Sequence, residues 1–342
     1  MKWKLCKAVA FIAIGVVLFS GFWKVFRFKY AKGLEQYYRL PKNTVDVLFI
    51  GSSHAFRSLD PSVMYGKSGI SSYALGSNAQ PMWITYYYLK EALRTQKPKV
   101  VCLEAYKVYL QKDYSDAPTV IKGTISMRTP WNYLASLWVS IEDKHEYLDC
   151  ALGFPWFHTR YRELSVRQDF APHYGKPYYE DFLGFFGEKP KAVELPSGVE
   201  QVTKEQKISD KTRLYLDKIV RLSQEQDFEL LFLIAPYYTD AVERQPYYNS
   251  LQNYADANGI PMINGNLLYD TLGLDEKTDF GRGNHLSMSG AVKFSRYVSR
   301  YLSSHYELAD HRGNKKYGRW ERNHELMDKY RESAQVETSS ED

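Results

Sequence analysis

Short apolar runs that alternate with helical stretches constrain the fold of this chain more than any other feature of its sequence. The clearest run, VDVLFI at 45–50, is rich in β-branched residues and ends at Gly51. This pattern is typical of a strand buried on both faces in a parallel sheet. Further strands are predicted at 71–74, 99–104, 229–235 and 260–263. Helices are predicted at 81–96, 204–226, 241–257 and 287–305.

Strands that alternate with helices form βαβ units with helices on both faces of the sheet. The chain is therefore predicted to be an α/β protein, a flavodoxin-like three-layer sandwich with a mainly parallel sheet, over residues 40–308. An aromatic-rich segment at about 110–200 breaks the rhythm and holds a helix at about 131–141. We interpret it as an insertion or cap over one end of the sheet. The charged residues 309–342 are expected to be a flexible tail, either partly helical or disordered.

The N-terminus carries an uncharged, mostly apolar run at 8–23, between Lys7 and Lys24. A helix that spans a membrane needs about 20 residues, and the run reaches that length if the flanking lysines extend to the interfaces. No small-residue cleavage site follows it, because Phe22 and Trp23 end the run. Residues 1–32 are therefore predicted to be an uncleaved anchor with its flanks, and a cleaved signal peptide is the alternative.

The net charge of +5 comes from this anchor segment. Residues 1–32 hold seven Lys and Arg and no acid, which leaves 38 basic against 40 acidic residues in the remainder. A folded domain of near-neutral charge gives no support to a nucleic-acid-binding role. The three cysteines form no disulfide or zinc pattern, and no phosphate-binding or dinucleotide motif is present. We expect neither a metal nor a cofactor.

Two polar motifs lie where a parallel sheet presents its functional edge. Gly51-Ser52-Ser53-His54 directly follows the first strand, and ligands of open parallel sheets bind outside the carboxyl ends of the strands. Asn284-His285-Leu286-Ser287 precedes the last helix. A serine hydroxyl needs a base within hydrogen-bond reach to act as a nucleophile. Ser53 and His285 are therefore the candidate nucleophile and base.

Together these motifs resemble the SGNH/GDSL hydrolase family over about residues 45–305, without the insertion. The resemblance places the nucleophile at Ser53, in a variant of the block found in membrane-anchored members that handle envelope polymers. It places the base at His285. Gly76, in Leu75-Gly76-Ser77-Asn78, matches the family's second block. The backbone N–H groups of Ser53 and Gly76 would then form the oxyanion hole.

Two departures from the family pattern concern the partners of these residues. The acid that usually stands three residues before the histidine is replaced by Arg282. Asp279, six residues before the histidine, could orient the imidazole if the loop curls back, and Asn284 is the alternative. The usual third-block asparagine is absent after the third strand, and Asn78 could supply that donor to the oxyanion hole.

The resemblance implies acyl transfer through a Ser53 acyl-enzyme, either to a hydroxyl of a cell-envelope polysaccharide or polymer or to water. Both transferase and esterase activities remain open. It also implies a location outside the cytoplasmic membrane and a multi-span membrane O-acyltransferase as partner. Lysines and arginines flank both sides of the anchor, so the charge rule does not decide its orientation. The alternative function is that of a non-catalytic binding or assembly partner, which Arg282 at the acid position would suit.

Overall fold

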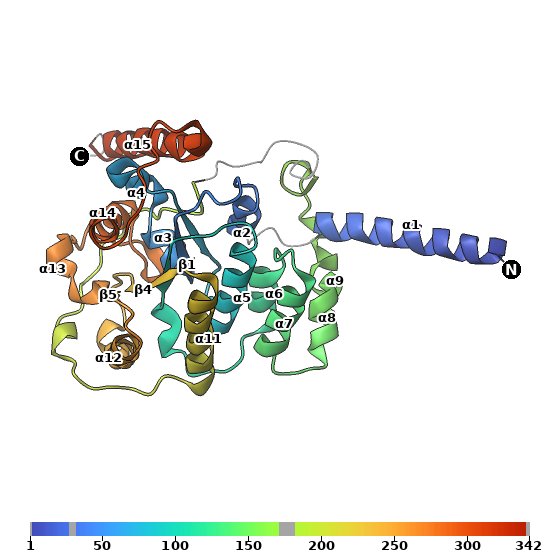
Figure 1. The fold of residues 1–342 in the computed structure, drawn as a ribbon, viewed down its shortest axis with the longest axis horizontal. Coiled ribbons are helices and arrows are strands. Elements are labelled where there is room, and N and C mark those ends of the chain that lie inside the picture. Colours follow the sequence, from blue (N-terminus) through green and yellow to red (C-terminus); the bar gives the residue numbers. More distant parts are fainter. Residues whose placement is uncertain (1, 27–31, 171–181, 340–342) are drawn as a thin grey trace.

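Five parallel strands form the centre of the molecule in the computed structural model, which describes residues 2–26, 32–170 and 182–339 (Figure 1). Their order across the sheet is β2-β1-β3-β4-β5. The strands are β1 (Val47–Gly51), β2 (Ser72–Gly76), β3 (Val100–Glu104), β4 (Glu229–Ile234) and β5 (Met262–Asn264). All run in one direction, so their carboxyl ends share one edge, where Gly51 lies opposite Gly76.

Helices cover both faces of the sheet, and the predicted three-layer α/β/α sandwich is confirmed. Successive side chains of β1 point to opposite faces, as in any strand. Leu48 and Ile50 belong to one buried cluster, and Val47 and Phe49 to the other. The first cluster includes residues of α5 (Met82–Ala92), α11 (Asp210–Gln226) and α12 (Ala241–Ala257). The second includes residues of α4 (Pro61–Ser68) and α14 (Met288–His305).

The helical part of the insertion packs beside α5 (Figure 1). Its buried side chains, such as Val120, Leu137 and Cys150, extend the cluster on the α5 face of the sheet. Its elements are α6 (Ala117–Thr124), α7 (Pro130–Ser140), α8 (Glu146–Leu152), α9 (Phe154–Phe157) and two short turns, η2 (His158–Arg162) and η3 (Val166–Phe170). The helix expected at about 131–141 is therefore present as α7.

An extended segment, 182–196, crosses from the edge of the sheet to the site. The carbonyl of Leu183 accepts a hydrogen bond from the N–H of Ala74 in β2, at 3.0 Å. Farther along, the N–H of Phe186 donates to the carbonyl of Phe56 and that of Lys191 to the carbonyl of Phe280, both at 2.8 Å. This part of the insertion connects the nucleophile region to the loop that carries His285.

The charged C-terminal region is packed as far as its side chains are described, to Arg331, which contradicts the expectation of a flexible tail for this part of the chain. After the turn η7 (Lys315–Tyr317), helix α15 (Gly318–Ser339) lies on α4 (Figure 1). Trp320 is fully buried, and its indole N–H donates to the carbonyl of Ser72 at 2.8 Å. Met327 is buried as well. A few large apolar residues thus hold a helix that is otherwise charged.

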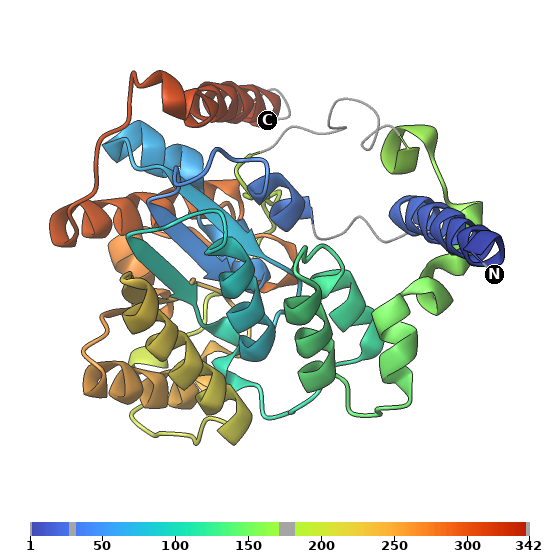
Figure 2. The same ribbon diagram turned by 45° about the vertical axis from the view of Figure 1, so that its right-hand side comes forward.

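Helix α1 (Lys2–Phe26) extends away from the body of the protein, as Figures 1 and 2 both show. It is long and apolar enough to cross a membrane, as an anchor or as a signal sequence, and its apolar part is not buried. Its C-terminal end contacts α9, η2 and η3. The indole N–H of Trp23 donates to the carbonyl of Leu152 at the end of α8, at 3.0 Å.

Candidate active site

Ser53 stands at the first position of helix α3 (Ser53–Ser58), directly after β1. Ser52 caps this helix, because its backbone is extended and its hydroxyl accepts a hydrogen bond from the N–H of His54 at 3.3 Å. Gly51 makes the tight turn possible. A Cβ at that position would lie 2.5 Å from the carbonyl oxygen of Glu104 on the neighbouring strand. The sequence therefore places the Ser53 hydroxyl at the carboxyl edge of the sheet.

His285 reaches this hydroxyl from the other end of the chain. Its Nε2 lies 2.8 Å from Oγ of Ser53, a full hydrogen bond. The loop that carries His285 is closed by a bridge between Phe280 and Leu286. Ser287 follows as the N-cap of α14, with its hydroxyl accepting from the N–H of Gly290. The structure thus brings together the two residues expected to be nucleophile and base.

The second nitrogen of the imidazole contacts a main-chain carbonyl. Nδ1 of His285 lies 3.0 Å from the carbonyl oxygen of Arg282. The intervening Gly283 has φ +67°, a left-handed conformation that curls the chain back on itself. A carbonyl oxygen only accepts hydrogen bonds, so this contact requires the proton on Nδ1. Nε2 is then free to accept the proton of Ser53.

Burial controls the charge of this imidazole. Burial, with smaller contributions from the cations Arg57 and Lys107, lowers the pKa of His285 to about 4, against the opposing effect of the hydrogen bond with the Arg282 carbonyl. His285 is consequently neutral at physiological pH, the form in which a general base must start.

Asp279 does not contact the imidazole. Its side chain is fully buried and forms an ion pair with Lys293 of α14. It also accepts a hydrogen bond from the N–H of Asp275 at 2.7 Å. The prediction of Asp279 as the orienting acid placed it in the right loop but gave it the wrong partner. Its carboxylate instead connects the start of the loop to α14.

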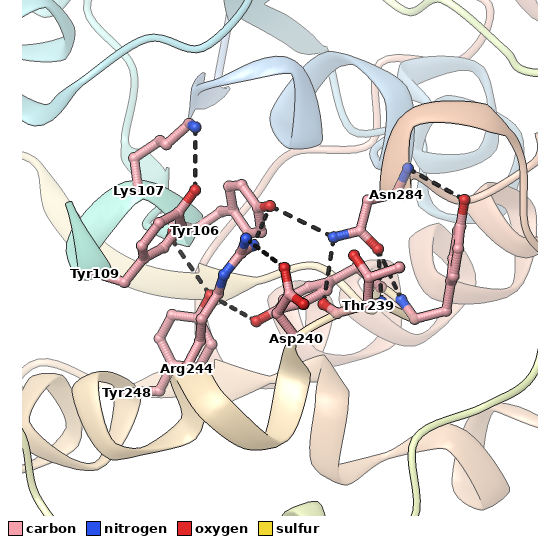
Figure 3. A network of polar contacts seen from close by, with 10 residues as sticks. Tyr106, Lys107, Tyr109, Thr239, Asp240, Arg244, Tyr248 and Asn284 are labelled. Atoms are coloured by element: carbon pink, nitrogen blue, oxygen red, sulfur yellow. Dashed lines mark hydrogen bonds and ion pairs between the residues drawn. The ribbon is translucent and has the colours of Figure 1, made fainter.

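Asn284 holds the loop rather than the histidine ring (Figure 3). Its amide oxygen accepts from the N–H groups of Tyr238 and Thr239, at 3.1 and 2.8 Å. Its amide nitrogen lies 3.4 Å from the hydroxyl of Tyr106. The residue has φ +67°, which asparagine tolerates better than most residues. Asn284 therefore ties the loop before His285 to the segment after β4.

The network in Figure 3 continues from Tyr106 to the cations at the same edge of the sheet. The guanidinium of Arg244 donates to the hydroxyl of Tyr106 and forms an ion pair with Asp240 at 2.9 Å. Lys107 donates to the hydroxyl of Tyr109 at 3.2 Å. These contacts join the turn η1 (Tyr106–Tyr109) after β3 to helix α12. They fix the wall of the site that faces His54.

The candidate oxyanion donors are only partly brought together. Gly76 ends β2 next to the nucleophile turn, and a Cβ there would lie 2.3 Å from the carbonyl oxygen of Gly51. Only glycine permits so close an approach between the ends of β1 and β2. Asn78 is exposed in the turn that follows, beside Ala79 with its φ of +53°. The positions of Ser53 and Gly76 thus suit backbone donors, while the role of Asn78 stays a prediction.

His54 is a site residue that sequence reasoning did not identify. Its ring stacks on Tyr106, with centroids 3.7 Å apart, and lies 4.7 Å from the ring of His285. Burial holds its pKa well below the usual value, and the nearby His285 adds to this effect. Its Nδ1 is buried without a hydrogen-bond partner. A buried, neutral imidazole therefore lies directly beside the Ser53–His285 pair.

Glu104, the last residue of β3, is the second residue that was missed. It is buried, and its carboxyl group accepts from the hydroxyl of Ser52 at 3.1 Å and from the N–H of Tyr106 at 3.0 Å. Burial raises its pKa to about 7, although these two hydrogen bonds oppose the rise. Glu104 connects the turn that holds Ser53 to the turn that holds the His54 ring. The sequence did contain a signal for Glu104, because it is the one acidic residue of the apolar strand β3.

Comparison with known proteins adds no assignment. No protein-family model matches the chain, and a search of curated proteins finds no match.

Proposed function

We propose that this protein is a membrane-anchored acyl-transfer enzyme of the cell envelope. The observation that carries the proposal is the 2.8 Å contact between Oγ of Ser53 and Nε2 of His285. It supplies the assisted hydroxyl that nucleophilic catalysis requires. The placement of Ser53 at a helix start beside Gly76 supports the same conclusion, because backbone N–H groups there can stabilise an oxyanion.

The reaction would proceed in two steps. Ser53 Oγ attacks an ester carbonyl while Nε2 of His285 takes the hydroxyl proton, and the same nitrogen returns that proton to the departing alcohol. An acceptor hydroxyl, or water, then attacks the acyl-enzyme and gives its proton to His285, which passes it to Oγ of Ser53. The N–H groups of Ser53 and Gly76 would hold the oxyanion in both steps.

The carbonyl of Arg282 performs one of the two roles of the carboxylate that was expected to contact Nδ1. It selects the tautomer with the proton on Nδ1, and loss of the correct tautomer accounts for a rate loss of about 10⁴ when a triad acid is made neutral. It brings no negative charge to offset the imidazolium that forms. We therefore expect slower catalysis than in an enzyme with a carboxylate at this position.

The acceptor would be a hydroxyl of an envelope glycan or polymer, and the domain would lie outside the cytoplasmic membrane on its α1 anchor. A multi-span membrane O-acyltransferase that delivers the acyl group is the partner that the family resemblance suggests. The length and apolar surface of α1 support an anchor. The substrate and partner rest on the resemblance alone.

The second candidate function is a non-catalytic assembly partner with the same fold. The position of Asp279, paired with Lys293 rather than with His285, favours it. The two functions differ in whether Ser53 reacts.

A fluorophosphonate probe on the full chain in nanodiscs tests this difference. We expect labelling of the wild-type protein, none with Ser53→Ala, and strongly reduced labelling with His285→Ala. Ser289→Ala, an exposed serine in the first turn of α14, is the matched control and should label normally. Equal labelling of wild type and Ser53→Ala would reject the enzyme proposal. Mass spectrometry of an oligosaccharide incubated with an activated acetyl ester would then separate transfer from hydrolysis.

A further inference from the structure

The elements around the end of α1 carry a group of exposed apolar side chains. Helix α9 and the turns η2 and η3 contact α1, and α8 accepts the hydrogen bond of Trp23. On α8, η2 and η3 the exposed apolar residues, here called the anchor-side patch, are Leu148, Leu152, Tyr161, Val166 and Phe170. Leu148 is 68% exposed and Val166 78%. Exposed apolar side chains on the elements that surround the end of an anchor helix are candidates for contact with the bilayer.

The pattern on α8 shows how the patch is built. Leu148 and Leu152 are four residues apart and therefore lie on one stripe of the helix. Cys150, two residues from each, is fully buried on the opposite side. Helix α8 thus has two apolar faces, of which one packs into the protein and the other faces outward.

The position of α1 indicates that a lipid bilayer covers the outer face of α8. A helix of 25 residues is about 37 Å long, and the hydrocarbon core of a bilayer is about 30 Å thick. Trp23, near the end of α1, then lies at the membrane surface, where tryptophan is enriched. Because its indole is bonded to the carbonyl of Leu152, the end of α8 must lie at the same depth.

Charged groups near the patch fit a shallow position. Arg160 of η2 donates to the carbonyl of Phe26 at 2.6 Å and forms an ion pair with Asp169 at 2.9 Å. Exposed charges beside the patch include those of Glu146, Asp149, Arg162 and Glu163. Three of these four are acidic, so the patch suits a zwitterionic headgroup layer better than the hydrocarbon core or a strongly anionic surface.

We infer that the anchor-side patch rests in the headgroup layer of the bilayer that α1 crosses, as a second membrane contact of this protein. The bilayer must reach Trp23 wherever α1 is inserted, and the patch is carried by the elements that surround that point. With two points of attachment the domain cannot swing freely on α1. The Ser53–His285 pair is then held at a fixed orientation to the membrane. This inference depends on α1 as an anchor and does not depend on catalysis.

Single-cysteine labelling of the full chain in nanodiscs tests the inference. Cys6 is the exposed native cysteine, while Cys102 and Cys150 are fully buried and should not label. In a Cys6→Ser chain, Leu148→Cys and Val166→Cys receive an environment-sensitive dye. The matched control is Leu214→Cys, half-exposed on α11. A chain labelled at the native Cys6 reports whether α1 is inserted.

We expect doxyl-labelled lipids to remove most of the fluorescence of the dye at positions 148 and 166, and iodide to quench it weakly. The dye at position 214 should respond in the opposite way. If the dye on Cys6 is quenched by lipid while the dyes at 148 and 166 behave like that at 214, the inference is wrong. Protection that appears only with two or more chains per nanodisc would also overturn it, because the patch would then bind a second copy.

Discussion

The carbonyl oxygen of Arg282 lies 3.0 Å from Nδ1 of His285, on the far side of the ring from Ser53. The main chain thus orients the base of this site. The residue that replaces the expected acid contributes through its backbone, and its own side chain is exposed. The contact fixes a tautomer without adding a charge, and several expectations depend on that distinction.

The pH dependence of catalysis should have an unusually low acid limb. Since burial lowers the pKa of His285 to about 4, the base stays neutral where an ordinary histidine, with a pKa of about 6.5, would be protonated. We expect kcat/KM for a neutral ester to stay level as the pH falls through 6.5 and to decline only towards pH 4. The same group stabilises the fold above pH 6.5 and ceases to do so as the pH falls to about 4. A decline of kcat/KM centred near pH 6.5 would contradict the prediction that burial keeps the imidazole of His285 neutral down to about pH 4.

Gly283→Ala should impair catalysis more than it impairs folding. The new Cβ would lie 3.2 Å from Cε1 and Nδ1 of the His285 ring, in a residue with φ +67°. The left-handed conformation costs about 1–2 kcal/mol in an alanine, and a displaced imidazole costs about ten- to hundredfold in kcat. Gly259→Ala is the matched control, since it has φ +66° and no atom within 4 Å of its Cβ. Its thermal unfolding should shift similarly while its kcat remains normal.

Asp279→Asn should reduce stability and spare the chemistry. The substitution removes a fully buried carboxylate from Lys293, which is itself partly exposed. We expect a loss of about 3 kcal/mol, at the low end for a broken buried pair, and kcat within severalfold of wild type below the melting transition. A loss of about 10⁴ in kcat would instead identify Asp279 as a triad acid. The exposed Asp270→Asn should change neither quantity.

Glu104→Gln should change how stability depends on pH. The pKa of Glu104 rises from 4.5 to about 7 on folding, a difference of 7 − 4.5 = 2.5, equivalent to about 3 kcal/mol. The raised pKa favours the folded state fully below pH 4.5, and this contribution is lost as the pH rises to about 7. In denaturant unfolding, the variant should match wild type in acid and exceed it by up to about 3 kcal/mol above pH 7. A difference independent of pH would show that folding does not shift the pKa of Glu104.

Trp320→Ala should show that the charged C-terminal region is part of the fold. The side chain is fully buried and bonded to the carbonyl of Ser72 in β2. We expect the free energy of unfolding to fall by about 3–5 kcal/mol. Trp131→Ala, at a tryptophan that is 79% exposed, should have little effect.

The sheet and its main helices could be predicted because strands buried on both faces leave an unmistakable apolar pattern. The edge of the sheet where Ser53 and His285 meet followed from that topology. The orienting group could not be predicted, because a main-chain carbonyl has no signature in the sequence. The sequence signal for it was the pair Gly283 and Asn284. Both residue types tolerate the left-handed conformation that turns the Arg282 carbonyl towards the imidazole. The packing of helix α15 was missed because the large apolar residues that hold it, Trp320 and Met327, are too few to outweigh its charges.

The contact between Ser53 and His285 joins positions separated by 232 residues. A chain exported from its N-terminal end would present Ser53 long before His285, and before the C-terminal helix that buries Trp320 against β2. During that interval the hydroxyl has no base. If the domain is exported and Ser53 is the nucleophile, as proposed, the site therefore stays inactive until the C-terminal part of the domain has folded, and a chain truncated in transit never becomes active.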